Sequence, residues 1–467
     1  MIDLSLYTGD TDGEGQNEAA PLGLRSSAFN QPYAFYQIFS LELSSMPTSL
    51  FVLPQLPEWT RQLANVLPLA VFVEFIDVSL KLHVFELDGL IPLWSWPITP
   101  KDARILLSNK DTSAACCLDR PESGRKALQC IDGRYGDYYQ SNASATVRLC
   151  VSTLGVDQKI RNESRNLLHN KARMQRLDFL HISQVQVSSG SKVRKALFGQ
   201  QSVRYCLVSS LGWLLWIAVT CFSFLGGVYF AAAYLVLMPL SGVMAFLTHG
   251  GEARTLDCRT SEFTRLVLAA DSLNATEWWS FYGGSRSLNS LLRRPLYREA
   301  GLALSRPVRL VMQTLILGQW VLAIASCAKQ DWNALVIAFW VFWCAFSSEY
   351  GYAAEHSIKD WLKYSCNVRL RRIQASFSSR KAMLGALVYL NPDTVGRRLQ
   401  WINHIFEDGS ERREWETALL DFIETGSCND DTLRDKPCWG WIEEGVEMGR
   451  KIAAALQDSE KSYLSLA

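Results

Sequence analysis

The chain has 467 residues and a formal net charge of +1, because 47 Lys and Arg face 46 Asp and Glu. Proteins that bind nucleic acid through their overall charge are strongly basic, so this composition excludes that class and no nucleic-acid partner is expected. The 12 cysteines include no C-x-x-C pair, which favours free thiols in a reducing compartment over a disulfide framework.

Residues 1–28 are predicted to be a disordered acidic tail. The first twenty positions carry several acids and no Lys or Arg, and a segment of this composition buries too little apolar surface to order itself. It also lacks the basic and apolar regions of a secretory signal, so the first apolar span is expected to act as the insertion signal.

Residues 29–200 are predicted to form a cytosolic α+β domain. The clearest strand is 76–84, in which apolar and polar residues alternate with a period of two. Weaker strands are expected at 35–43, 145–151 and 182–187, and a helix is expected at 163–180. The apolar stretch 66–76 contains Pro68 and Glu74 and is too short to span a membrane.

Two pairs of apolar runs predict an α-helical integral membrane protein with four transmembrane helices arranged as two hairpins. No Lys, Arg, Asp or Glu occurs in 205–251, and a helix needs roughly 20 apolar residues to cross a bilayer. A second pair follows in the chain, so the predicted hairpins are 205–248 and 308–350. Helices buried in a soluble protein are the alternative, but the repetition of the pattern favours a membrane.

The distribution of Lys and Arg predicts the orientation of the hairpins. The basic residues lie before the first span, between the hairpins and after the last span, whereas both hairpin turns are nearly free of them. By the positive-inside rule, the N-terminus, the central loop and the C-terminus are all expected in the cytosol.

The central loop, 249–307, combines aromatic and basic residues in a pattern typical of segments at a lipid interface. A small packed subdomain with solvent-facing arginines is the alternative. After the last span a second basic stretch, 360–381, is either a lipid-recruiting segment or a topology signal only. The residues predicted to bind anionic lipid are Trp278, Trp279, Arg286, Arg293, Arg294, Arg298, Arg369, Arg371 and Arg372.

The region 351–467 is predicted to contain this basic segment and a cytosolic helical bundle. Helical spacing of apolar residues predicts a helix that begins at Asn391-Pro392, a second at 411–425 that stops at Gly426, and a third at 441–457. The stretch 391–426, NPDTVGRRLQWINHIFEDGSERREWETALLDFIETG, resembles a segment of uncharacterised multi-pass membrane proteins of filamentous fungi. The resemblance implies a membrane protein and brings no activity or site residues with it.

The sequence offers little catalytic or metal-binding chemistry. The cysteines and histidines lack the paired spacing of zinc ligands, and no catalytic motif, metal site or cofactor is predicted. Polar residues in the spans, such as Gln313 and Gln319, are interpreted as hydrogen-bonding between helices, since the spans contain no ionisable group. One candidate membrane-surface site lies near the cytosolic ends of the second and fourth spans and comprises His249, Glu349, Glu355 and His356. Solvated helix ends with no catalytic role are the favoured interpretation of these four residues.

Three classes of function follow from these observations. The favoured class is a membrane-anchored scaffold or adaptor for cytosolic protein partners or membrane lipid, because most of the mass is cytosolic and the spans lack polar machinery. The first alternative is a membrane-bound enzyme or accessory factor for an apolar metabolite, acting at the His249 site. The second is a channel or transporter formed as a homo-oligomer, because four helices alone enclose little space.

Overall fold

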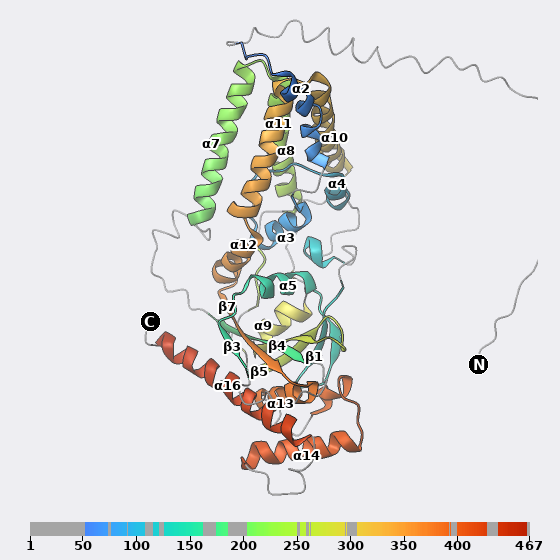
Figure 1. The fold of residues 1–467 in the computed structure, drawn as a ribbon, viewed down its shortest axis with the longest axis vertical. Coiled ribbons are helices and arrows are strands. Elements are labelled where there is room, and N and C mark those ends of the chain that lie inside the picture. Colours follow the sequence, from blue (N-terminus) through green and yellow to red (C-terminus); the bar gives the residue numbers. More distant parts are fainter. Residues whose placement is uncertain are drawn as a thin grey trace, which may run out of the picture. The chain divides into compact units, whose positions relative to one another are not determined.

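The computed structural model describes most of the chain from residue 52 to residue 464 (Figure 1). The gaps within that range are 73–75, 91, 108–114, 121–125, 162–173, 185–202, 250–252, 258–260, 262, 295, 297–305, 392, 394–398 and 427–437. The predicted tail 1–28 and the predicted strand 35–43 lie outside the described residues.

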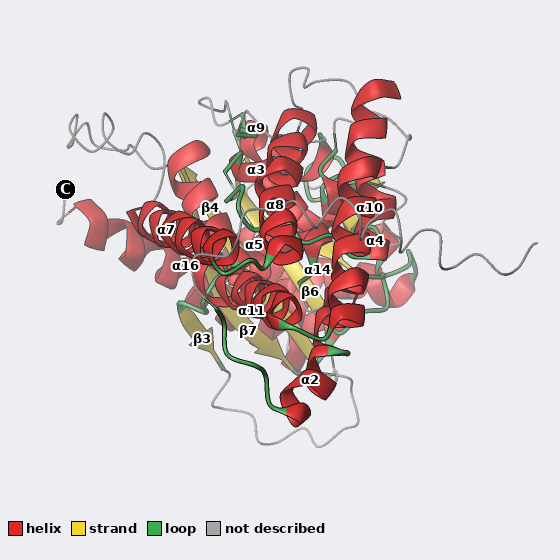
Figure 2. Cartoon of the chain, turned by 90° about the horizontal axis from the view of Figure 1, so that it is seen from above, coloured by secondary structure: helices red, strands yellow, loops and turns green. Residues whose placement is uncertain are grey.

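The four predicted spans are four helices, each long and apolar enough to cross a membrane. They are α7 (Val203–Leu225), α8 (Tyr229–His249), α10 (Arg306–Lys329) and α11 (Trp332–Phe346), the last of which continues as the π-helical turn η6 (Ser347–Gly351). We call these helices the apolar bundle. Helix α8 is central, because it packs against the other three (Figure 2).

Large apolar side chains cover the outside of the apolar bundle. Only 17% of the apolar window of α7 is buried within the protein, and Leu207 and Leu214 on this helix are 67% and 66% exposed. Phe342 on α11 and Tyr350 on η6 are exposed to a similar degree. Contiguous apolar surface of this kind is rare on a soluble monomer.

Strands from three separate parts of the chain form one seven-stranded sheet in the order β2-β1-β5-β6-β4-β7-β3. The strands before α7 are β1 (Gln129–Asp132), β2 (Tyr138–Gln140), β3 (Gln158–Ile160) and β4 (Gln175–Gln184). Those between the hairpins are β5 (Thr264–Ala270) and β6 (Glu277–Gly284), and β7 (Val368–Phe377) follows α11. The central strand β4 is parallel to β6 and antiparallel to β7.

The three soluble regions, which lie before, between and after the hairpins, therefore fold together. Leu177 of β4 is paired with Trp278 of β6 on one side and with Ala375 of β7 on the other. Neither the central loop nor the basic stretch after the last span is a connection only, because each supplies a central strand. In particular, 368–377 is not a surface segment but a strand between β4 and β3.

The two faces of the sheet are covered by different helices. One face packs against α13 (Arg380–Leu390), α14 (Ser410–Thr425) and α16 (Trp439–Leu464), in a core that includes Phe179 and Trp415. The other face packs against α5 (Ser144–Thr153) and the short helices α9 (Ser285–Leu288) and η5 (Asn289–Arg293). This second core continues without a break into the apolar bundle, so the sheet and the bundle share buried side chains.

Several predicted elements differ from the observed ones. The segment 76–84 is not a strand: it lies largely in helix α3 (Val78–Asp88), which Asp77 caps and which ends at Gly89 with φ of 75°. The predicted strand 145–151 is helix α5. Of the predicted helix 163–180, the part from residue 175 is strand β4, and 162–173 lie outside the described residues. The predicted strand 182–187 is described only to residue 184, within β4.

The C-terminal helices agree better with the sequence. Helices α14 and α16 lie where the apolar spacing places them, and α14 ends at Gly426 with φ of 71°. Of the predicted helix that begins at Asn391, the structure shows only the 3₁₀ turn η9 (Leu399–His404), and 392 and 394–398 are outside the described residues.

The segment between residues 52 and 107 packs on the apolar bundle rather than on the sheet. It comprises α2 (Glu58–Ala64), the 3₁₀ turn η2 (Leu67–Phe72), α3 and α4 (Pro100–Leu107). Helix α2 contacts α11, η2 contacts α10 and α11, α3 contacts α8, and α4 contacts α10. The first part of the predicted α+β domain is therefore packed on the apolar bundle, and only its later part belongs to the sheet.

Candidate functional site

A cluster of buried and half-buried polar side chains lies where the apolar bundle meets the sheet. We call it the junction cluster. Helix α3 contributes two members one turn apart, the 3₁₀ turn η3 (Cys117–Asp119) and its neighbours contribute three, and the end of α8 and the chain after it contribute two. The members are His83, Glu86, Cys116, Asp119, Arg120, His249 and Arg254.

Glu86 is the centre of the junction cluster and is 2% exposed. Its Oε1 accepts hydrogen bonds from Arg120 Nη2 at 2.9 Å and from His249 Nδ1 at 3.0 Å, and its Oε2 accepts one from the backbone N–H of Cys117 at 2.5 Å. Burial by itself would raise the pKa of the carboxyl. The hydrogen bond from His249 and the charges of His249, Arg120 and Arg254 outweigh burial and hold the pKa of Glu86 below its ordinary value.

Arg254 connects parts of the chain that are far apart in sequence. Its Nε donates to the carbonyl of Glu86 at 3.2 Å, its Nη1 donates to the carbonyl of Leu296, and its own carbonyl accepts the indole N–H of Trp361 at 2.7 Å. The arginine is 4% exposed. It therefore ties α3 to the central loop and to the chain that follows α11.

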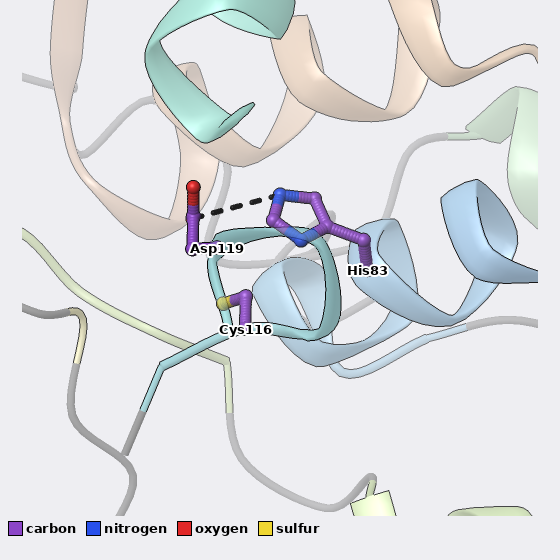
Figure 3. A group of neighbouring side chains, drawn as sticks. All are labelled: His83, Cys116 and Asp119. Atoms are coloured by element: carbon purple, nitrogen blue, oxygen red, sulfur yellow. Dashed lines mark ion pairs between the residues drawn. The ribbon is translucent and has the colours of Figure 1, made fainter. Parts of the chain in front are cut away.

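His83, Cys116 and Asp119 form the part of the cluster with metal-ligand chemistry (Figure 3). One ligand atom from each lies within 4.8 Å of the others. The backbone N–H of Leu118 donates to His83 Nδ1 at 3.1 Å, so the ring proton belongs on Nε2, which faces Thr146 Oγ1 at 3.1 Å. A metal ion at Nε2 would need the lone pair that this tautomer lacks.

The contacts of Asp119 and the burial of Cys116 also indicate a structural role for both residues. Asp119 accepts hydrogen bonds from the backbone N–H groups of Ala145 and Thr146 at 2.6 and 3.2 Å, and from the Thr146 hydroxyl at 2.5 Å, which satisfies the first turn of α5. Burial raises the pKa of the Cys116 thiol well above its ordinary value, so the thiol stays protonated. The geometry fits a hydrogen-bonded junction better than a metal site.

Only His249 of the predicted membrane-surface site belongs to the cluster. It contacts Glu86, which lies just beyond the predicted strand 76–84 and was not among the predicted site residues. Glu349 in η6 and Glu355 and His356 in helix α12 (Ala354–Asp360) are exposed. The missed members Glu86, Arg120 and Arg254 come from three distant segments, and no local spacing in the sequence relates them.

The residues predicted to bind lipid are divided between the sheet core and the surface. Trp278 is 1% exposed on β6 and its indole N–H donates to Gln175 Oε1 at 3.2 Å, so it packs in the protein and not in lipid. Trp279 is half-buried. The exposed members are Arg286, Arg293, Arg294 and Arg369.

The remaining predicted lipid ligands lie in β7 or outside the described residues. Arg372 is half-buried and pairs with Asp178 of β4 at 2.7 Å. Arg371 is half-buried on the same strand, and Arg298 is outside the described residues. The aromatic and basic pattern of the central loop thus reflects a central strand, whose alternate side chains enter the core, and not only an interfacial segment.

Searches of the sequence against protein-family models and curated proteins, and of the structure against solved structures, found no match. The function is therefore argued from the fold and from the geometry of the residues described above.

Proposed function

We propose that the chain is a membrane-anchored scaffold that holds one folded domain against the cytosolic face of a membrane. The observation that carries this proposal is the origin of the sheet. Strand β4 precedes the first hairpin, β6 lies between the hairpins and β7 follows the second, yet the three are adjacent. If the apolar helices span a bilayer, the three segments must emerge on the same side.

The charge pattern supports the cytosolic side. The segments that form the sheet carry the basic residues that flank the spans, whereas the two hairpin turns carry one Lys. The continuous core between sheet and bundle, together with the junction cluster, supports a fixed rather than a tethered domain.

The edge of the sheet at β2 supports a role in binding acidic protein segments. Among the described residues, strand β2 is paired on one side only. Tyr138 within it and Tyr135 just before it are 41% and 56% exposed. Arg293 lies 3.3 Å from Asp137 and over the ring of Tyr139, and Arg294 is exposed next to it. Exposed Tyr and Arg beside an open strand edge are typical of peptide-binding surfaces.

Proximity labelling from the C-terminus tests the scaffold proposal. We expect cytosolic proteins to be labelled by the wild-type chain and to be lost when Arg293→Glu and Arg294→Glu are combined. The matched control is Arg413→Glu, which changes an exposed arginine on α14. If the double variant labels the same set of proteins, this surface does not bind them. If alkaline carbonate extracts the chain from membranes, the proposed membrane anchorage is wrong.

A second candidate function, transport, is favoured by the placement of Lys81. The side chain is 7% exposed, and its Nζ donates to Ser95 Oγ at 2.7 Å and to the Ser95 carbonyl. Ionisable groups inside a bundle of membrane helices are commonly functional. Lys81 belongs to α3 and not to one of the four predicted spans, which contain no such group. Solute flux into liposomes that is lost in Lys81→Met would support transport over scaffolding.

A further inference from the structure

The segment that precedes the sheet enters the apolar bundle from the end opposite to the sheet. We call the end where α7 meets α8 and α10 meets α11 the turn end, and the other the sheet end. At the turn end, Trp332 Nε1 donates to the carbonyl of Pro54 at 2.9 Å. Leu53 lies against Gly226, where an added Cβ would be 3.1 Å from its side chain.

Farther along, the chain contacts the middle of the bundle helices. An added Cβ on Gly242 of α8 would overlap the carbonyl oxygen of Leu93, and one on Gly212 of α7 would overlap the ring of Trp94. At a rise of about 1.5 Å per residue, Gly242 is roughly 20 Å from the turn-end residue Tyr229. These glycines therefore admit residues 92–98 deep inside the bundle.

The buried backbone of this segment is satisfied by the bundle. Gln319 of α10 is fully buried; its Nε2 donates to the Trp96 carbonyl at 3.2 Å and to Ser241 Oγ at 2.8 Å, and its Oε1 accepts the Ile98 N–H at 3.2 Å. Trp320 Nε1 donates to the Ile98 carbonyl at 2.8 Å. Non-helical backbone at membrane depth is tolerated when it is buried in protein and paired in this way.

The chain reaches the sheet end at the C-terminus of α3. Glu86 there contacts His249, the last residue of α8, and the carbonyl of Leu87 accepts the backbone N–H of Arg254 at 2.8 Å. Between Pro54 and Glu86 the chain has therefore passed from one end of the bundle to the other.

The outer surface of α2 and η2 carries large apolar side chains at the turn end, next to the exposed ion pair of Glu58 and Arg61. Trp59, Leu63 and Val66 are 66%, 48% and 63% exposed, and this surface lies beside α10 and α11, whose outer faces are also apolar. The continuity of the two surfaces identifies lipid as the occupant, since a Trp-bearing short helix is typical of a bilayer interface.

We propose that the described residues between 52 and 82, namely 52–72 and 76–82, belong to a fifth membrane-crossing segment. In this proposal α2 lies in the leaflet farther from the sheet, and residues 92–98 dip back into the bundle. The proposal rests on the membrane anchorage proposed above. It places residue 52 on the membrane face opposite to the sheet. The described chain then crosses the membrane five times instead of the four times predicted from the sequence. The predicted cytosolic N-terminus itself falls outside the described residues.

Cysteine accessibility tests the crossing. Val52→Cys, at a position 93% exposed, and Arg413→Cys on α14 are placed singly in full-length chains whose accessible native cysteines are replaced by alanine. Sealed vesicles with the sheet side outward are treated with a membrane-impermeant maleimide. We expect Arg413→Cys to be labelled at once, and Val52→Cys to be labelled at least tenfold more after the vesicles are opened.

The outcomes separate the two proposals. Equal labelling of both positions in sealed vesicles, in chains that resist alkaline carbonate, overturns the fifth crossing and leaves the membrane anchor in place. Extraction of the chain by carbonate overturns the anchor and the crossing together. A depth measurement provides an independent check. The fluorescence of Trp59 is obtained as the difference between the spectra of the wild-type chain and Trp59→Leu, and lipids with brominated tails should quench it. A difference spectrum that brominated lipids leave unchanged would contradict the leaflet position of α2.

Discussion

Single polar residues decide how the bundle accommodates irregular backbone, and Gln319 is the clearest case. It is hydrogen-bonded to residues on two other segments, whereas Gln313, on the same helix, is exposed. Gln319→Leu leaves the Trp96 carbonyl and the Ile98 N–H without partners, and a buried unsatisfied group costs about 1–3 kcal/mol. We expect Gln319→Leu to lower the free energy of unfolding in detergent by that amount, seen as a lower melting temperature. Gln313→Leu should leave the melting temperature almost unchanged. Equal effects of the two substitutions would mean that the hydrogen bonds of Gln319 contribute nothing.

Asp88 makes stability depend on pH. Burial, followed by the nearby carboxylate of Asp360, raises the pKa of Asp88 to about 7 against the opposing hydrogen bond of Ser365. The folded chain holds this proton more tightly than the unfolded chain. The stabilisation that the proton gives to the folded state is therefore fully present below about pH 4 and is lost as pH rises through about 7. The loss is roughly 2–4 kcal/mol.

The prediction is that Asp88→Asn flattens the pH dependence of unfolding between pH 5 and pH 8 and raises the melting temperature at pH 8. Thermal scans in detergent at several pH values measure it. Asp421→Asn, at an exposed position on α14, is the control and should retain the wild-type slope. A slope that survives in Asp88→Asn would assign the effect to another group.

At the scale of elements, the junction cluster fixes α3 between α8 and the sheet. Among the described residues, Glu86 is the acid that contacts both Arg120 and His249. Glu86→Gln removes its charge, and breaking a buried ion pair costs about 3–5 kcal/mol. We expect a loss of that size in chemical unfolding of the purified chain. Glu355→Gln, at an exposed residue of the originally predicted site, should change the unfolding free energy by less than about 0.5 kcal/mol. A larger loss of unfolding free energy in Glu355→Gln than in Glu86→Gln would contradict the junction cluster and favour the site predicted from the sequence.

How far the elements could be predicted depended on the range of the interactions that define them. The four apolar helices and α14 are recognisable because apolarity on all sides, or on one face, is a local property of the sequence. Helix α3 resembles a strand because polar Lys81 and His83 alternate with apolar residues, and only distant partners such as Ser95 and Thr146 explain their burial. The junction cluster and the pairing of β4 with β6 and β7 are long-range and leave no spacing pattern.

At the scale of the whole molecule, three segments separated by the hairpins should unfold together. Phe179 on β4 is fully buried in the core that β4 shares with α13 and α16, and truncation of such a residue costs about 3–5 kcal/mol. Phe179→Ala should increase amide hydrogen exchange in β6 and β7 as much as in β4. Leu214→Ala, on the exposed face of α7, should leave exchange in the sheet unchanged. Faster exchange confined to β4 would show that the segments are independent.

The order in which the strands are synthesised has a consequence for how the protein is made. Strand β4 ends at Gln184, and its neighbour β7 is complete only at Phe377. At about 5–20 residues per second, the ribosome needs roughly 10–40 s to cover that distance. Strand β6 is complete earlier, at Gly284, but the edge of β4 that pairs with β7 lacks its partner for the whole interval. If the hairpins insert into a membrane as proposed, that strand edge stays open during insertion, so biogenesis should depend on a chaperone that shields it.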